Sequence, residues 1–331
     1  MRDLYPLLMS PVFDPRPWGT RDLSPIYPHH RFAEKIGEAW LTGDHSKVAN
    51  GWLQGQSLGK LSAEYGRDLV GARAPHAARF PLLVKFLFPC EKLSVQVHPD
   101  DETAQRRGQA WGKTECWYVA HAQDNAQVAI GLKPGVSRTQ FEQSIDEQRA
   151  EELLNWVDVR PGEMIYIAGG TVHTLGPGSI IVETQQSSDM TYRLYDYGRP
   201  RELHLKEGLS ALKERVPSGK VLRPAPRKIH GDRNRSWSLI ASPYFVVELF
   251  ELNEPCEVCL PEGKSSVQIL VATEGSGVLE SKGFEPVAMA RGDAVVVPAS
   301  LESFCIRPLQ SIGLLKSSLP NQQVPEPVTE F

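Results

Sequence analysis

The sequence lacks three features that would each indicate a particular class of protein: a long apolar run, a block of basic charge and a disulfide framework. No stretch approaches the roughly 18 to 20 apolar residues that a membrane-spanning helix needs, and the opening segment MRDLYPLLMSPVF has no signal-peptide cleavage pattern. The formal net charge of −4 is spread along the chain, so no basic face favours nucleic acid or a membrane surface. We therefore predict a cytoplasmic protein that binds neither nucleic acid nor membrane.

Cysteine is scarce. The chain has five cysteines, an odd number at scattered positions, which is typical of reduced thiols rather than of disulfides. Cys256 and Cys259 form a lone C-x-x-C motif. Because no second pair accompanies it, we interpret the motif as two cysteines of a strand, in preference to a metal knuckle or a redox pair.

Turn-forming residues are abundant instead. The 331 residues include 27 glycines and 26 prolines, which separate short apolar or alternating runs such as PLLVKFLF, ECWYVAHA and SVQILVAT. This density of short strands predicts a mainly β protein, a sandwich or a barrel. Helical spacing is rarer: we predict a helix over residues 137–157, with Ser137 as its N-cap, and short helices near residues 60 and 208.

The chain contains an internal repeat. Residues 160–175, RPGEMIYIAGGTVHTL, align with residues 290–305, ARGDAVVVPASLESFC, so that Gly162 lies opposite Gly292. Both stretches have a Gly-acid turn, an apolar strand, a second turn and another strand. A repeated unit of this kind predicts two related β modules.

The repeat also predicts a difference between the modules, because His173 falls opposite Ser303 in this alignment. The second module therefore lacks the histidine. The Arg- and Pro-rich stretch 223–236 has the composition of a linker. We predict a first module over residues 1–230 and a second, metal-free module over residues 231–331.

The stretch LSVQVHPD, residues 93–100, alternates like a strand but carries polar side chains on one face. Ser94, Gln96 and His98 share that face, because side chains two apart on a strand point the same way. Such a face is either solvated, as in most antiparallel sheets, or lines a site.

Other segments supply further candidate ligands. Lys113 and Glu115 share one face of a predicted strand in GKTECWYV, and His173 begins another in GGTVHTLG. With Gln96 and His98 they offer two imidazoles, a carboxylate and an amide oxygen, a set that suits zinc and, less selectively, manganese, iron or cobalt. Taken singly, each residue also has an ordinary interpretation as a hydrogen-bonded or solvated polar side chain.

The turn pattern strengthens the metal interpretation. PGEMIYIAGGTVH has the form P-G-x-x-x-x-I-x-x-G-x-x-H and resembles the second conserved motif of the cupin superfamily, with QVHPD and Glu115 standing where the first motif would be. Cupins are double-sheet jelly rolls that hold a metal inside the barrel. The resemblance implies a mainly β chain of two cupin-type jelly-roll modules with a few short helices and one metal site.

A more specific resemblance covers roughly residues 11–215. The strings KFLFPCEKLSVQVHPDDETA, GKTECWY and GTVHTLGPGSIIVETQQSSDMTYRLYDYGRPRELH resemble the type I mannose-6-phosphate isomerases of the short bacterial form, and PVFDPRPWGTRDL and IGEAW resemble that family's opening. The resemblance implies interconversion of mannose 6-phosphate and fructose 6-phosphate through a cis-enediol or enediolate. It also implies one Zn²⁺ per chain, held by Gln96, His98, Glu115 and His173.

The resemblance also implies two catalytic side chains. Arg193, in SDMTYR, matches the family's catalytic arginine and would hold the enediolate oxygens, since its fixed charge makes it a poor base. Lys113 shares a strand face with Glu115, so it would lie beside the metal, where its pKa is lowered and it becomes a candidate acid or base. A metal-bound water is the alternative proton carrier.

Three further positions match the family's substrate-binding residues: Ser94, Lys85 and Arg199. A cation or a hydroxyl group at these places can hold a phosphate. For Lys85, which lies within an apolar run, the alternative is an edge-strand lysine whose ammonium reaches solvent. We expect a small sugar phosphate as the partner and a monomer or weak homo-oligomer.

Two other classes of function remain open from the residues alone. One is a non-catalytic sugar-phosphate-binding or regulatory cupin, which the presence of Arg193 and Lys113 disfavours. The other is an iron-dependent oxygenase of cupin type, which Gln96 disfavours because such enzymes use mainly histidine ligands.

Overall fold

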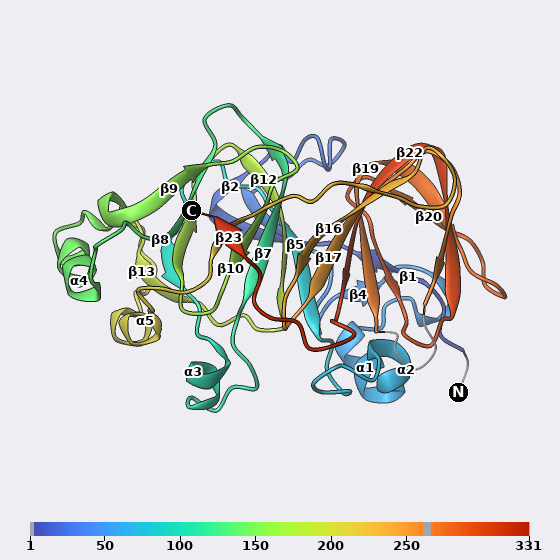
Figure 1. Ribbon diagram of the computed structural model, residues 1–331, viewed down its shortest axis with the longest axis horizontal. Helices are drawn as coiled ribbons and strands as arrows, with labels where there is room; N and C mark the ends of the chain where they lie inside the picture. Colours follow the sequence, from blue (N-terminus) through green and yellow to red (C-terminus); the bar gives the residue numbers. More distant parts are fainter. Residues whose placement is uncertain (1–2, 261–265, 331) are drawn as a thin grey trace.

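The computed structural model describes residues 3–260 and 266–330. Over these residues the chain forms two β modules that lie side by side, with a few short helices at the periphery (Figure 1). The mainly β, cupin-like architecture predicted from the sequence is confirmed. Within the described ranges, no helix is long and apolar enough to cross a membrane.

The first module is a pair of antiparallel sheets. The larger sheet contains, in spatial order, β2 (Val12–Thr20), β3 (Ile36–Trp40), β5 (Leu82–Leu87), β12 (Ser179–Gln186), β7 (Glu115–Ala122), β10 (Met164–Ile167), β14 (Gly219–Val221) and β23 (Thr329–Glu330). The smaller sheet contains β13 (Tyr192–Tyr195), β6 (Val95–Val97), β11 (Val172–Leu175), β8 (Gln127–Leu132) and β9 (Leu154–Asp158).

The larger sheet is buried on both faces. On β7, Trp117 and Val119 pack between the two sheets of the first module, whereas Cys116 and Tyr118 pack in the core shared with the second module. Its strands are therefore apolar on both faces rather than alternating. Charged side chains on its inner face need a specific reason to be there.

The second module surrounds a separate apolar core. Its sheet runs β15 (Arg227–Lys228), β16 (Arg235–Ala241), β17 (Val246–Leu252), β22 (Ser303–Ser318), β19 (Gln268–Glu280), β21 (Ala294–Val297), β1 (Leu7–Ser10) and β4 (Lys47–Val48), with β18 (Cys256–Cys259) on β22 and β20 (Val287–Ala290) on β19. Leu270, Val295, Phe304 and Leu314 pack together inside it.

The two ends of the chain are exchanged between the modules (Figure 1). The N-terminal strand β1 pairs with β21 of the second module, and the C-terminal strand β23 pairs with β14 of the first. The hydroxyl of Tyr166 on β10 bonds the carboxylate of Glu326, which leads into β23. These contacts and the shared apolar core hold the modules together.

The structure contains the predicted repeat, with one correction. Gly162 and Gly292 both adopt positive φ, 88° and 92°, in the turns before β10 and β21. On β11 the inward side chain is His173, but on β22 it is Phe304, which is 2% exposed and packs in the module's core, while Ser303 is only partly buried. His173 therefore corresponds to Phe304, because a shift of one residue reverses which side chains face inward.

The helices are α1 (Leu58–Tyr65), α2 (Arg67–Val70), α3 (Asp101–Gln105), α4 (Arg138–Asp146) and α5 (Leu205–Ala211). The predicted helices near residues 60 and 208 are confirmed as α1 and α5. Ser137 caps α4 as predicted. Its Oγ accepts a hydrogen bond from the backbone N–H of Gln140, and the Gln140 side chain accepts one from the backbone N–H of Ser137.

The predicted helix over 137–157 is too long. It stops at Asp146, and Gln148 adopts a φ of 58°, which no right-handed helix accommodates. A short 3-10 turn, Ala150–Leu153, follows, and the remainder is strand β9. Trp156, which falls within the predicted helix, lies on β9 opposite Ala129 of β8.

Candidate active site and metal centre

Strand pairing aligns three of the predicted site residues. Gln96 on β6 lies directly opposite His173 on β11 and directly opposite Arg193 on β13. Directly paired residues place their side chains on the same face of a sheet. Ser94 and His98, which flank β6, are 4% and 1% exposed, so this polar face points between the two sheets and not to solvent.

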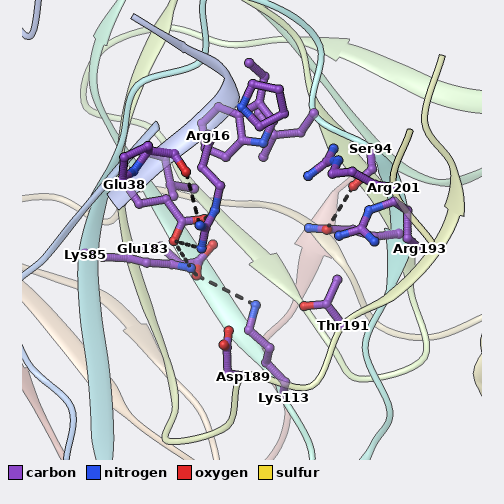
Figure 2. A pocket seen from close by; sticks show the side chains of 16 residues that line it. Arg16, Glu38, Lys85, Ser94, Lys113, Glu183, Asp189, Thr191, Arg193 and Arg201 are labelled. Carbon is purple, nitrogen blue, oxygen red and sulfur yellow. Dashed lines mark hydrogen bonds and ion pairs between the residues drawn. The ribbon is translucent and has the colours of Figure 1, made fainter. Parts of the chain in front are cut away.

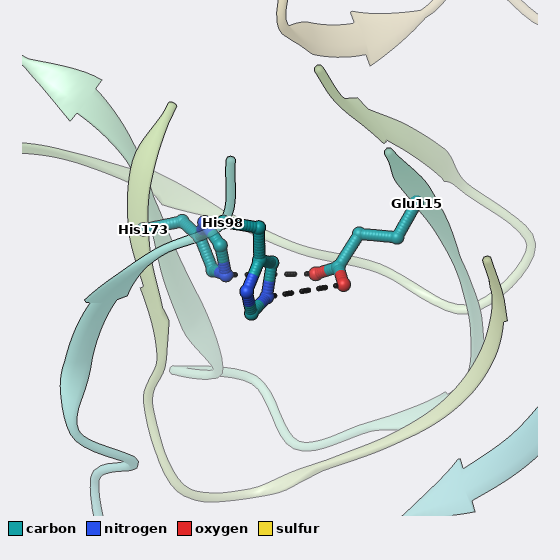
Figure 3. A group of neighbouring side chains, drawn as sticks. All are labelled: His98, Glu115 and His173. Atoms are coloured by element: carbon teal, nitrogen blue, oxygen red, sulfur yellow. Dashed lines mark ion pairs between the residues drawn. The ribbon is translucent and has the colours of Figure 1, made fainter. Parts of the chain in front are cut away.

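Glu115, from the facing sheet, completes a compact group with the two histidines (Figure 3). Its Oε2 lies 3.3 Å from His98 Nε2, and its Oε1 lies 3.5 Å from His173 Nε2. One ligand atom of each residue lies within 4.8 Å of the others, and all three side chains are buried. The spacing suits three ligands of one metal ion.

Backbone carbonyls fix the orientation of both imidazoles. His98 Nδ1 donates to the carbonyl of Met190 at 3.0 Å, and His173 Nδ1 donates to that of Thr171 at 2.9 Å. The proton on Nδ1 leaves the lone pair on Nε2 of each ring. This arrangement, in which the second ring nitrogen is anchored, is the usual one for histidines that bind metal.

The charge states also suit a metal site. Burial and the Lys113 ammonium lower the pKa of His98 to about 3, and burial lowers the pKa of His173. Burial alone would raise the pKa of Glu115, but the Lys113 ammonium holds it well below its usual range. Neutral imidazoles beside an ionised carboxylate are the forms that bind metal.

Gln96 lies beside this group. Its Nε2 is 3.2 Å from His173 Nε2, and its Oε1 is 3.5 Å from the Ser94 hydroxyl. Rotation of the amide by 180° exchanges the oxygen and the nitrogen without moving other atoms. That rotation turns the oxygen toward His173, so Gln96 fits as a fourth ligand.

Lys113 donates hydrogen bonds to two of the atoms that would bind the metal. Its Nζ donates to Glu115 Oε2 at 2.6 Å and to His98 Nε2 at 2.9 Å. Because a lone pair bonds one cation at a time, Lys113 would release these acceptors where a metal ion is held. Glu183, whose Oε1 is 3.8 Å away, would remain its anionic neighbour.

A polar cavity of about 470 Å³ opens beside this group (Figure 2). Four of the predicted substrate-binding and catalytic residues line it: Ser94, Lys85, Lys113 and Arg193. Gln96 lines it too, which connects the cavity to the metal group. The volume suits a phosphorylated sugar.

One wall of the cavity is a network of alternating charges. Lys85 Nζ lies 3.2 Å from Glu183 and 3.5 Å from Glu38 Oε2. Arg16 donates to both oxygens of Glu38, at 3.2 Å to Oε2 and 3.3 Å to Oε1. Burial alone would lower the pKa of Lys85, but the carboxylates of Glu183 and Glu38 more than offset it and raise the pKa. The lysine is thus buried and charged, and it does not reach solvent as an edge-strand lysine would.

Arg193 and Arg201 lie side by side across the cavity from Arg16 (Figure 2). Arg201 is held by a bidentate pair with Asp196, at 2.6 and 2.7 Å. Arg199, predicted to bind substrate, is absent from the residues that line the cavity in the described parts of the chain. Its guanidinium bonds Asp196 and the Lys92 carbonyl instead.

Several residues of the cavity were not found from the sequence: Arg16, Trp18, Glu38, Glu183, Asp189, Thr191 and Arg201. Arg16 and Glu38 lie within PRPWG and IGEAW. The resemblance of these segments to the opening of the isomerase family assigns no role to either residue. Glu183 lies within the apolar run SIIVETQQS, where a charged residue on an inner face is a usable signal. Trp40, also in IGEAW, donates to Glu38 through its indole nitrogen.

The C-x-x-C motif forms no metal site in the described residues, where His98, Glu115 and His173 are the single group of His, Cys, Asp and Glu with ligand spacing. Cys256 is buried in the core of the second module, and Cys259 is exposed on the same strand, β18. Their interpretation as two strand cysteines is confirmed.

The fold and the site define a two-module, cupin-like protein whose first module carries a candidate metal centre beside a charged cavity. The family model for the catalytic domain of type I phosphomannose isomerase matches residues 20–111. The chain is 36% identical to mannose-6-phosphate isomerase ManA of Bacillus subtilis over 90% of its own length and 95% of the relative's. It is 32% identical to a mannose-6-phosphate isomerase of Streptococcus mutans over 90% of its length and 94% of that protein.

Solved structures agree. The crystal structure of the mannose 6-phosphate isomerase from Bacillus subtilis superposes with a TM-score of 0.84 at 32% identity, covering 95% of this chain and 99% of that one. A phosphomannose isomerase variant from Salmonella typhimurium shares the fold, with a TM-score of 0.76 at 15% identity. The chain belongs to the type I phosphomannose isomerase family. The prediction that it is an enzyme of the isomerase class is thereby confirmed.

Proposed function

We propose that this enzyme interconverts mannose 6-phosphate and fructose 6-phosphate, depends on zinc, and moves a proton between C1 and C2 through a cis-enediol or enediolate. The observation that carries the proposal is the convergence of two carbonyl-anchored imidazoles and Glu115 on one point beside a charged cavity that also contains Arg193. Relatives above 30% identity that carry the name of this activity support it.

The donor set supports zinc. Two neutral imidazoles, one carboxylate and one amide oxygen are borderline ligands, which zinc accepts readily. A metal held by Gln96, His98, Glu115 and His173 would supply Lewis acidity to the oxygens at C1 and C2. Because Gln96 is neutral, it reduces the Lewis acidity of the metal less than another carboxylate would.

The chain's own residues supply the remaining functions. Arg193, paired with Gln96 across the sheet, is placed to hold the negative charge that develops on the sugar oxygens. Lys113, 3% exposed and between Glu115 and Glu183, is placed to hold or return a proton at C1 or C2. Ser94 and Lys85 provide a hydroxyl and an ammonium group on the cavity wall.

Phosphate binding is proposed for cations at the cavity edge. Arg199 was predicted for this role from the family resemblance. Arg201 is the stronger candidate, because it lines the cavity and its planar guanidinium is held by Asp196 in a fixed orientation.

A charged phosphate ester does not cross a bilayer unaided, which supports a cytoplasmic location.

The test is conversion of fructose 6-phosphate by the purified, zinc-loaded protein in deuterated water. We expect mannose 6-phosphate to form with deuterium at C2, since an enediol exchanges its proton with solvent. A protein that holds zinc and converts no substrate would support the non-catalytic sugar-phosphate-binding alternative instead. Iron bound to the protein as purified, before zinc is added, together with oxygen consumption, would support the oxygenase.

A further inference from the structure

The second module contains its own small polar cavity, of about 210 Å³, which residues of β17, β22 and β19 line. Its position corresponds to that of the active site in the first module. Lys85 on β5 lies opposite Glu183 on β12, and Glu248 on β17 lies opposite Lys316 on β22. Each module thus has a cross-strand ion pair at this place, with the signs exchanged.

The next inward positions correspond as well. Glu115 on β7 lies opposite Gln185 on β12, and Gln268 on β19 lies opposite Ser318 on β22. An amide therefore stands where the first module has its carboxylate ligand.

Gln268 carries an acceptor that the protein leaves unsatisfied. Its side chain lines the cavity and the residue is 5% exposed. Its Nε2 donates to the Ser266 carbonyl at 2.7 Å, which fixes the amide, because the flipped amide would bring two oxygens together. In the described residues nothing donates to Gln268 Oε1. A buried acceptor of this kind favours a ligand that brings a hydrogen-bond donor. Because less than 1 Å² of this oxygen is accessible, the ligand must displace the side chains that cover it.

The charges of the cavity indicate the rest of the ligand. Lys316 Nζ is 2.6 Å from Glu248, so these two charges balance. Arg227 also lines the cavity, is exposed, and adds one positive charge to the balanced pair. Val258 and Leu260 provide an apolar side. The complementary molecule is small, has a short carbon chain and carries one anionic group.

We propose that the second module binds a small hydroxylated anion: a short carbon chain with a hydroxyl group that donates to Gln268 Oε1 and a phosphate or carboxylate group that faces Arg227. The site is separate from the cavity of the first module. It holds whether or not the chain has the isomerase activity proposed above.

Cys259 provides a local readout, because it lines this cavity and is exposed. The rate of its alkylation by iodoacetamide is measured by peptide mass spectrometry on the full chain, with exposed Cys90 of the first module as the internal reference. The probes are sn-glycerol 3-phosphate, D-glycerate, glycerol and inorganic phosphate. We expect at least one of the two hydroxylated anions, glycerol 3-phosphate or D-glycerate, to protect Cys259. At saturation it should slow the alkylation of Cys259 at least about threefold relative to that of Cys90.

Variants separate the two contacts. Gln268→Leu removes the acceptor at similar volume and should abolish protection, while Gln310→Leu, an exposed glutamine on the same sheet, should not change it. Arg227→Met should raise the half-protecting concentration of the anion about tenfold and leave glycerol unaffected. Circular dichroism verifies that each variant is folded.

Four outcomes would overturn the proposal. They are no protection by either hydroxylated anion, equal protection by glycerol, protection that persists in Gln268→Leu, and equal protection by inorganic phosphate, which would indicate an adventitious ion only.

Discussion

The two modules share a strand order but differ in what their strands place inside. Three inward positions that are polar in the first module are filled differently in the second: Gln96, Glu115 and His173 correspond to Val258, Gln268 and Phe304. The framework accepts either set, because only the alternation of inward and outward residues is needed for the sheets to pack. The proposed chemistry therefore depends on a few inward side chains and not on the jelly roll itself.

The largest expected effect is that of His98→Ala. Loss of one anchored imidazole should remove the metal and lower kcat at least about a thousandfold, since a metal supplies several kcal/mol of transition-state stabilisation. Metal analysis and the isomerase assay measure the two effects. The matched control is His121→Ala, an exposed histidine on β7, which should retain both. Normal metal content and turnover in His98→Ala would show that the polar face of β6 is not the metal site.

Arg193→Met should lower kcat by about 10²–10³, the usual cost of removing one preorganised donor to developing charge. The bound metal should stay, because Arg193 is not among the ligands. This split between metal content and kcat distinguishes a role in charge stabilisation from a role in building the site. Equal loss of metal would contradict it.

The reversed ion pairs allow a direct comparison of the modules. In Lys85→Met, Glu38 and Glu183 remain buried without their shared cation, and we expect a loss of about 3–5 kcal/mol in the free energy of unfolding. In Lys316→Met, Glu248 is left with a side chain that is 28% exposed, so water replaces much of the interaction and the loss should be about 1 kcal/mol or less. Urea unfolding followed by fluorescence measures both. Equal losses would show that burial does not distinguish the two pairs.

A smaller effect separates the two arginines that share Asp196. Arg201→Met should raise KM for fructose 6-phosphate about tenfold, because its guanidinium lines the cavity. Arg199→Met should change KM less than about threefold, because its guanidinium faces the Lys92 carbonyl and Glu91. Steady-state kinetics of the two variants decide between them, and the reverse order would restore Arg199 as the phosphate-binding residue.

The sequence was sufficient for the parts of the site that lie on single strands. The two-residue period of LSVQVHPD places Gln96 and His98 together, and the same period places Lys113 beside Glu115. Arg16, Asp189 and Arg201 could not be placed in this way, because only the packing of distant segments brings them to one cavity. Their individual strings contain no periodicity that indicates a shared site.

Two errors in the predicted fold have local causes. The helix over 137–157 was extended too far because apolar residues of β9 coincide with helical spacing, and nothing in the composition marked the positive φ of Gln148. The repeat was misaligned by one residue because a change in turn length leaves the composition of a strand unchanged while reversing its faces. Phe304, not Ser303, is the counterpart of His173.

The central claim, that one metal ion is held inside the first module alone, is tested most directly by anomalous diffraction at the zinc absorption edge from crystals of the zinc-loaded protein. The account predicts one peak per chain, bonded to His98 Nε2, His173 Nε2, a carboxylate oxygen of Glu115 and the amide oxygen of Gln96. A peak between β17 and β22 of the second module, or none at the histidines, would contradict it.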